Sequence, residues 1–255
     1  MEMKGIVGGF YRISEWIMRL SAINLLWIIC SLPVVFLVFS QVLYLTQQPE
    51  ISIQSIYELI AALILPIIVA PFTFYPATSA VFSMARKWAI GDVDIPLFKS
   101  YFRYFKSNYK QAMLGGIFFN VVLIVLLVNI QFYADQQSVF SVLNYLFLLL
   151  LAILVAGIVN FFCYLSHFEM RLMSLLKNSM LFTVARPMNT LYILITNFAI
   201  IYISFFKFTF LIPFFMGSIM AIVSFWGFYR SILRIQDKLD RQREREESKA
   251  AEESQ

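Results

Sequence analysis

Long apolar runs alternate with short stretches of charged residues along this chain, and the alternation predicts helices that cross a membrane. About 20 consecutive apolar residues are needed to cross the hydrocarbon core of a bilayer. We expect six spans of this kind, at about residues 22–45, 56–84, 112–132, 140–165, 189–206 and 209–228. The last two lie in one apolar block that, as a single helix, would measure roughly 60 Å, about twice the hydrocarbon thickness. We therefore expect this block to fold as a hairpin.

The basic residues predict how these spans are oriented. With six spans, all of the 20 Lys and Arg residues except Lys207 lie on one side of the membrane. Because basic residues are retained on the cytoplasmic side, both termini and two inner loops, at about 86–110 and 167–188, are predicted to be cytoplasmic. The expected fold is an all-α, multi-pass membrane helical bundle in the cell membrane, with a single membrane domain at residues 1–229.

The composition agrees with this interpretation. The 255 residues are 60% hydrophobic and 14% charged, and the mean hydropathy is +0.77, whereas soluble domains carry roughly a quarter charged residues. A water-soluble fold of this length would be unable to bury so much apolar surface. Cys30 and Cys163 both lie in apolar runs, where free thiols behave as small hydrophobic side chains.

Residues 5–20 precede the first span and have the pattern of an amphipathic helix. One face carries Ile6, Phe10, Ile13, Ile17 and Leu20, and the opposite face carries Lys4, Arg12, Glu15 and Arg19. Such a pattern predicts an interfacial helix that lies on the membrane surface. The alternative is that these residues form the first turns of the following span.

Prolines interrupt the apolar spans. Pro33 is expected to bend the first span. In the second span, Pro66, Pro71 and Pro76 each leave a carbonyl group four residues earlier without its helical donor. The freed carbonyl groups are those of Ala62, Ile67 and Phe72. We expect packed neighbours or the nearby hydroxyl groups to bind them, namely those of Thr73, Thr78 and Ser79.

Aromatic and basic residues are interleaved in the first inner loop. Asp94 is a suitable cap for a helix that follows it. The candidate docking residues of this loop are Arg86, Lys87, Trp88, Phe98, Lys99, Phe102, Arg103, Phe105, Lys106, Tyr109 and Lys110. Rings and basic groups on neighbouring stripes of one helix are typical of a helix at the headgroup level, where it contacts anionic lipids. The alternative is a docking surface for a protein partner; binding of nucleic acid is not expected.

The centres of the spans hold amides rather than ionisable groups. The candidate intramembrane polar contacts are Asn24, Asn120, Asn160 and Asn197, and such amides commonly hold helices together. The scarcity of intramembrane charges disfavours a transporter coupled to an ion gradient. At the pair Gly115 and Gly116, close helix packing is expected.

His167 is the single histidine, and with Glu169 it offers the only candidate for catalysis. Together with Cys163 these residues have a spacing that brings three potential metal ligands near one another. We interpret His167 instead as an interfacial histidine beside a carboxylate, since a metal site needs better closure. We expect no catalytic residue, no cofactor and no metal.

The tail at residues 230–255 differs in kind from the rest. Ile232, Ile235 and Leu239 have helical spacing, which predicts a helix of about three turns. The mixed charges that follow lack apolar anchors, and this pattern predicts a solvated, frayed end in the cytoplasm.

Several short motifs occur in a fixed order along the chain. They are Asn24-Leu25-Leu26-Trp27 with Pro33, Pro76-Ala77-Thr78-Ser79-Ala80, Arg86-Lys87-Trp88, Phe98-Lys99 through Phe102, Phe105-Lys106 and Asn108-Tyr109-Lys110. In these motifs the chain resembles the YesL-like family of small integral membrane proteins from Gram-positive bacteria. The resemblance implies a family of unknown function that occurs near carbohydrate-uptake and sugar-degradation systems, and it brings no catalytic or ligand residues with it.

These observations lead to two functional hypotheses. The first is a non-enzymatic accessory or regulatory component associated with carbohydrate uptake, with anionic lipids and a sugar-uptake transporter complex as partners. The alternative is a permease for a neutral solute such as a sugar, because aromatic and amide side chains suit sugar binding and proline-broken helices suit a site in the membrane. A membrane-embedded enzyme that uses His167 and Glu169 is a third option.

Overall fold

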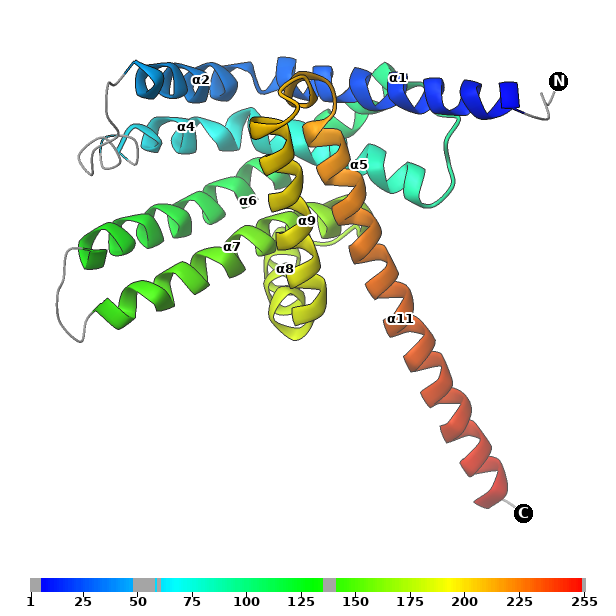
Figure 1. Ribbon diagram of the computed structural model, residues 1–255. Helices are drawn as coiled ribbons and strands as arrows, with labels where there is room; N and C mark the ends of the chain where they lie inside the picture. Colours follow the sequence, from blue (N-terminus) through cyan, green and yellow to red (C-terminus); the bar gives the residue numbers. More distant parts are fainter. Residues whose placement is uncertain (1–5, 48–57, 59–60, 135–140, 254–255) are drawn as a thin grey trace.

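The computed structural model describes residues 6–47, 58, 61–134 and 141–253, and every regular element in this part of the chain is a helix. The helices are α1 (Ile6–Cys30), α2 (Leu32–Thr46), α4 (Ile64–Val69), the 3₁₀ helix η1 (Ala70–Phe72), α5 (Phe74–Ala89), α6 (Leu97–Ala134), α7 (Ser141–His167), α8 (Leu172–Ala185), α9 (Pro187–Phe206), α10 (Leu211–Phe214) and α11 (Met216–Glu253) (Figure 1).

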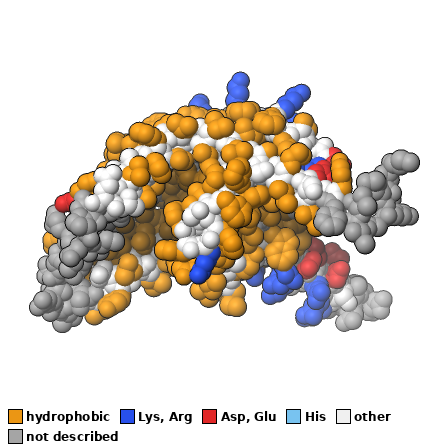
Figure 2. Space-filling view, turned by 45° about the horizontal axis from the view of Figure 1, so that its top comes forward, with side chains coloured by type: hydrophobic (Ala, Val, Ile, Leu, Met, Phe, Trp, Pro, Cys, Tyr) orange, Lys and Arg blue, Asp and Glu red, His pale blue; other side chains and the backbone are white. Residues whose placement is uncertain are grey.

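Five of these helices are long and apolar enough to cross a membrane. They contain the candidate spans Tyr11–Cys30, Leu97–Tyr133, Val142–His167, Pro187–Phe206 and Met216–Lys249. A sixth span is formed if Ile64–Phe72 and Phe74–Ala89, which are bent by 56° relative to each other, cross together. Hydrophobic side chains cover most of the face shown in Figure 2, as expected for a surface in contact with lipid. The predicted all-α membrane bundle is therefore confirmed.

Helix α5 lies at the centre of the bundle and packs against α1, α6, α7 and α11. Eleven of its 16 residues are buried. Ala77 and Ala80 are fully buried, because small side chains allow neighbouring membrane helices to approach closely. The helix that leads into the first inner loop therefore lies in the core of the protein.

Helix α1 continues without interruption from residue 6 into the first predicted span and ends at Cys30, just before a break at Ser31. The continuous helix agrees with the alternative that these residues form the first turns of the following span, and the interfacial position stays a prediction. The expected span at residues 22–45 is not one helix, because it is interrupted at Ser31, two residues before Pro33. Ile13 and Ile17 are 60% and 50% exposed, whereas Arg19 is only 8% exposed. Of the predicted polar face, Arg19 is buried and Glu15 is half-buried, whereas Arg12 is exposed.

Helix α6 joins two predicted elements into one helix of 38 residues. The predicted boundary between the inner loop and the third span, near residue 111, is absent. Gly115 and Gly116 lie inside this helix without breaking it, because a Cβ atom at either position would clash with the ring of Phe161 or Tyr75. The expected close packing at this glycine pair is confirmed.

Helices α9 and α11 form the hairpin predicted for the last apolar block, and they pack against each other. The final span begins at Met216 rather than near residue 209, because Pro213 lies in the separate short helix α10. Helix α11 then extends away from the bundle to Glu253 (Figure 1). The predicted fraying after three turns is thus corrected: the tail is rich in Arg, Glu, Lys and Ala, which have the highest helix propensities.

Candidate functional site

The candidate docking residues cluster where α5 ends and α6 begins, but they differ in exposure. Lys87 in the last turn of α5 forms an ion pair of 2.8 Å with Asp92. Trp88 is buried, and its ring meets the edge of Trp16 at a centroid distance of 5.5 Å. Trp88 therefore anchors α1 to α5 and is not available to lipid or a partner.

The first four turns of α6 carry the exposed part of this cluster. Phe98 and Phe102 are 61% and 50% exposed. Tyr101, which the sequence pattern places on the same stripe, is fully buried, and its hydroxyl donates to the Ala77 carbonyl oxygen at 3.3 Å. We call the exposed set the α6 basic surface; it consists of Phe98, Lys99, Phe102, Arg103, Lys106 and Lys110.

Phe105 and Tyr109 lie at the margin of the α6 basic surface. Both are half-buried, and their ring centroids are 5.9 Å apart. Together with Phe102, Lys106 and Lys110 they border a shallow hollow of about 580 Å³.

A buried arginine fixes the segment between α5 and α6. Arg19 donates to the Val93 carbonyl oxygen, pairs with Glu15, and lies 3.3 Å from a carboxylate oxygen of Asp94. Asp94 was predicted to cap a helix, but α6 begins only at Leu97, after Pro96, and Asp94 binds Arg19 instead. Helix α1 thus holds the start of the α6 basic surface in place.

A polar cavity of about 730 Å³ lies between α5, α6 and the end of α7. It is lined among others by Arg86, Asn108, His167, Glu169 and Arg171. The cavity brings His167 and Glu169 together with Arg86, while Cys163 stays in the core with no exposed surface. Within the described ranges, no group of three His, Cys, Asp or Glu side chains is placed to hold a metal ion.

The side chains around this cavity are only partly satisfied. Asn108 Nδ2 donates to Ser83 Oγ at 3.1 Å, which links α6 to α5. His167 Nδ1 and Arg86 Nε are buried and have no hydrogen-bond partner among the described residues. His167 packs edge-on against Phe168 at 4.6 Å. Two unsatisfied donor or acceptor groups facing one polar cavity make it suited to a small polar ligand.

Asn24 binds the break between α10 and α11. Its Nδ2 donates to the carbonyl oxygens of Ile212 and Pro213 at 3.0 and 2.7 Å. Its Oδ1 accepts from the backbone N–H groups of Gly217 and Ser218 at 2.8 and 3.1 Å. One fully buried side chain thereby satisfies both open ends of a broken helix.

Asn120 has the same role at the break before α5. Its Nδ2 donates to the Ile67 carbonyl group freed by Pro71, and its Oδ1 accepts from the Tyr75 hydroxyl at 2.8 Å. The Phe72 carbonyl group accepts from the Tyr109 hydroxyl at 3.1 Å. The donors therefore come from α6.

The hydroxyl groups predicted to bind these freed carbonyl groups do not do so. Thr78 and Ser79 donate to the carbonyl groups of Phe74 and Pro76 within their own helix. The Thr73 hydroxyl is buried without a partner among the described residues. The alternative of packed neighbours is the one that holds for the Ile67 and Phe72 carbonyl groups. A hydroxyl group on a helix reaches the carbonyl group one turn back more easily than one at a break.

Asn160 and Asn197 also connect helices. Asn160 Nδ2 donates to Thr183 Oγ1 at 2.9 Å, which ties α7 to α8. Asn197 Nδ2 donates to Ser224 Oγ at 2.8 Å, which ties α9 to α11. All four predicted intramembrane amides therefore contact a neighbouring helix.

The fold and its polar contacts define a multi-pass helical membrane protein. A family described as a protein of unknown function, DUF624, matches residues 20–130. The uncharacterized protein YesL of Bacillus subtilis (strain 168) is 27% identical over 223 residues, which are 88% of this chain and 89% of YesL.

Two further proteins of the same organism are similar. The uncharacterized protein YteU is 23% identical over 239 residues, 92% of this chain and 90% of YteU. The uncharacterized protein YesV is 26% identical over 121 residues, 47% of this chain and 58% of YesV. No solved structure matches the chain at a significant level. These matches confirm the predicted resemblance to the YesL-like family of unknown function.

Proposed function

We propose that this protein is a non-enzymatic accessory or regulatory component of a carbohydrate-uptake system, and that it contacts a transporter subunit through its α6 basic surface on the cytoplasmic side. The resemblance to the YesL-like family supports the link to carbohydrate uptake. The exposure of the surface supports its role in docking.

The single observation that carries this proposal is the pairing of unneutralised charge with exposed rings. In the part of the chain that the structure describes, Lys99, Arg103, Lys106 and Lys110 have no acidic side chain within ion-pair distance. Phe98 and Phe102 stand among them. Aromatic residues and arginine are enriched at the centres of protein interfaces. An acidic, partly apolar surface of a partner matches this arrangement in charge and in hydrophobicity.

The intramembrane amides favour an accessory role over a permease. Asn24 and Asn120 bind the backbone groups that the broken helices leave open. A solute site in a transporter commonly uses such open backbone groups for the substrate. Here protein side chains already occupy them, so the breaks are closed.

Affinity purification in a mild detergent tests the proposal. The tagged protein, expressed at its natural level, is expected to retain subunits of a carbohydrate transporter at a constant ratio. Recovery of the protein alone, under conditions that keep an unrelated transporter complex intact, would contradict it. A His167→Ala variant with lost function but normal partner recovery would instead favour the enzymatic option.

A permease for a neutral solute is the second candidate, because the 56° bend between Ile64–Phe72 and Phe74–Ala89 interrupts an apolar segment. Liposomes that contain the purified protein would show flux of at least one sugar if this candidate is correct. Absence of flux over a broad panel of sugars, with a known sugar transporter active in parallel, excludes it.

A further inference from the structure

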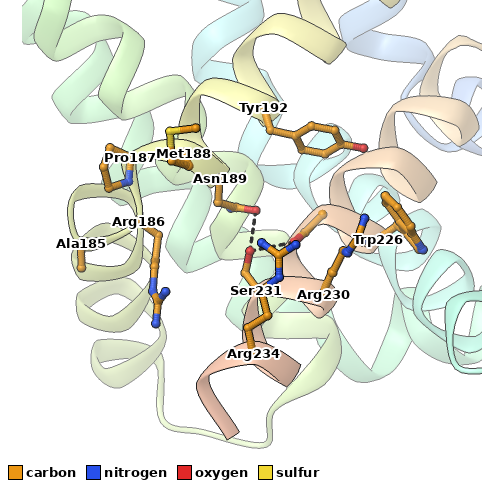
Figure 3. A pocket seen from close by; sticks show the side chains of 11 residues that line it. Ala185, Arg186, Pro187, Met188, Asn189, Tyr192, Trp226, Arg230, Ser231 and Arg234 are labelled. Carbon is orange, nitrogen blue, oxygen red and sulfur yellow. Dashed lines mark hydrogen bonds between the residues drawn. The ribbon is translucent and has the colours of Figure 1, made fainter. Parts of the chain in front are cut away.

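A second basic pocket lies between the start of α9 and the middle of α11, away from the α6 basic surface (Figure 3). Its volume is about 470 Å³. Arg186 and Asn189 come from the α9 side, and Arg230, Ser231 and Arg234 come from α11. In the view of Figure 3, Arg234 turns back toward Ser231 and Asn189.

The positive charge of this pocket is not neutralised by the protein. Among the described residues, none of its three arginines forms an ion pair with a carboxylate. The guanidinium group of Arg230 lies 5.1 Å from the ring centroid of Trp226, which orients it without removing its charge. Three guanidinium groups around one pocket attract an anion, and each is suited to bidentate contact with phosphate oxygens.

The side-chain amide of Asn189, which lines this pocket, lacks a hydrogen-bond acceptor. Asn189 is only 7% exposed. Its Oδ1 accepts from Ser231 Oγ at 3.2 Å, while its Nδ2 has no partner among the described residues. Buried polar groups are nearly always hydrogen-bonded, so an orphaned N–H group that lines a pocket indicates a missing acceptor.

The N-terminus of α9 adds to this positive field. Helix α9 has 20 residues and begins at Pro187, and no side chain caps its first turn. An uncapped helix N-terminus favours a negative charge. The uncapped helix end favours a negative charge, and the unpartnered Asn189 amide requires an acceptor. An anion with acceptor oxygens meets both requirements.

The position of the pocket along α11 matches the headgroup layer of a membrane. Trp226 is 49% exposed, and tryptophan is enriched at the boundary between lipid and water. The chain before Trp226 is apolar, whereas charged residues begin at Arg230. Basic pockets between membrane helices at this depth bind lipid headgroups.

We propose that the pocket formed by Arg186, Asn189, Arg230, Ser231 and Arg234 binds a phosphate group, supplied by the headgroup of an anionic phospholipid. The same chemistry allows a soluble phosphate compound as the source. Neither the family resemblance nor the docking role assigns this site.

Native mass spectrometry of the protein, purified in detergent and supplied with lipid, tests this proposal. We expect phosphatidylglycerol to be retained at least fivefold more than phosphatidylcholine. The double variant Arg186→Gln/Arg234→Gln is expected to lose this preference, and the control Lys238→Gln/Arg241→Gln, with the same change in charge further along α11, is expected to keep it. Equal retention by the wild type and the double variant would overturn the lipid assignment.

Calorimetric titration with inorganic phosphate, in nanodiscs of phosphatidylcholine, separates the two sources. Binding of phosphate that the double variant loses, without any preference for phosphatidylglycerol, assigns the pocket to a soluble phosphate compound. Absence of both phosphate binding and lipid preference would refute the site altogether.

An Asn189→Asp variant distinguishes loss of the binding site from loss of the fold. A carboxylate at this position suits the first turn of a helix and has nearly the same shape, so the fold is expected to persist. The carboxylate replaces the amide donor by a negative charge that repels the anion, so the lipid preference is expected to fall at least fivefold. An unchanged preference in a well-folded Asn189→Asp variant would contradict the proposed site.

Discussion

The side-chain amide of Asn24 donates a hydrogen bond of 2.7 Å to the carbonyl oxygen of Pro213, which lies 189 positions later in the chain. This contact joins α1 to α10, the short helix that precedes α11. Its oxygen also accepts two backbone N–H groups at the start of α11. Asn24 therefore couples the two ends of the membrane domain.

Replacement of Asn24 by Leu is expected to destabilise the protein strongly. Four backbone groups lose their partner in a buried site, and the free energy of unfolding should fall by on the order of 3 kcal/mol. Asn129→Leu is the matched control, because among the described residues the Asn129 amide donates to the Val125 carbonyl group of its own helix. Thermal unfolding in detergent measures both, and equal losses would contradict the bridging role.

A double-mutant cycle tests the contact between Asn120 and the carbonyl group freed by Pro71. In the wild type, Asn120→Ala leaves the Ile67 carbonyl group without its donor. In a Pro71→Ala background, the new N–H group is able to bind this carbonyl group, so Asn120→Ala should cost about 1 kcal/mol less. Strict additivity of the two changes would show that the proline and the amide act independently.

The glycine pair in α6 offers a test of close packing. A Cβ atom at Gly115 would lie 2.3 Å from Cζ of the buried Phe161. Gly115→Ala should therefore lower stability by about 1–3 kcal/mol. Gly9→Ala meets no atom within 4 Å and should be neutral or stabilising by up to about 1 kcal/mol. A stable Gly115→Ala variant would be inconsistent with the packing described.

Charge reversal probes the α6 basic surface as a whole. Replacement of Lys99, Arg103 and Lys106 together by Glu is expected to disturb membrane insertion or to reduce recovery of a partner at least tenfold, since each basic group near an anionic surface contributes about 1 kcal/mol. A triple Glu variant at Lys238, Arg241 and Arg243 of α11 is the control. Normal insertion and full function of the first variant would show that this stretch is a passive connector.

Much of the fold was predictable because lipid imposes simple rules. A span must be apolar and about 20 residues long, so a bundle of five to six spans and the hairpin after Pro187 followed from hydropathy. Helix ends were less predictable. The sequence has no helix-ending residue between residues 97–110 and the rest of α6. The interleaved aromatic and basic residues indicate a change from lipid to water, not a break in the helix.

The inward or outward direction of single side chains could not be predicted from periodicity. Tyr101 shares a stripe with Phe98 and Phe102, yet its hydroxyl meets the Ala77 carbonyl group inside the bundle. Arg19 lies on a face predicted to contact water, yet it is buried and binds the Val93 carbonyl group and the exposed carboxylate of Asp94. Each outcome depends on a partner from another helix, and a single sequence does not reveal that partner.

The pocket around Asn189 could not be predicted from the sequence, because its residues come from two helices that are distant in the chain. Arg186 immediately precedes a proline at a helix start, which is a local signal for a positive helix end. Arg230 and Arg234, however, belong to the segment at residues 230–255, which the sequence pattern predicts to be a charged tail. Only the packing of α9 against α11 brings these residues to one place.

Site-specific photocrosslinking in living cells tests whether the α6 basic surface contacts a carbohydrate transporter. A photoreactive residue replaces Phe102 on the α6 basic surface in one variant, and Phe132 in the other. Both side chains are at least half exposed and lie on the same helix, 30 residues apart. If the α6 basic surface is the docking site, position 102 crosslinks to a subunit of a carbohydrate transporter and position 132 does not. Crosslinks to lipid alone from position 102, with the transporter present in the same membrane, would contradict it.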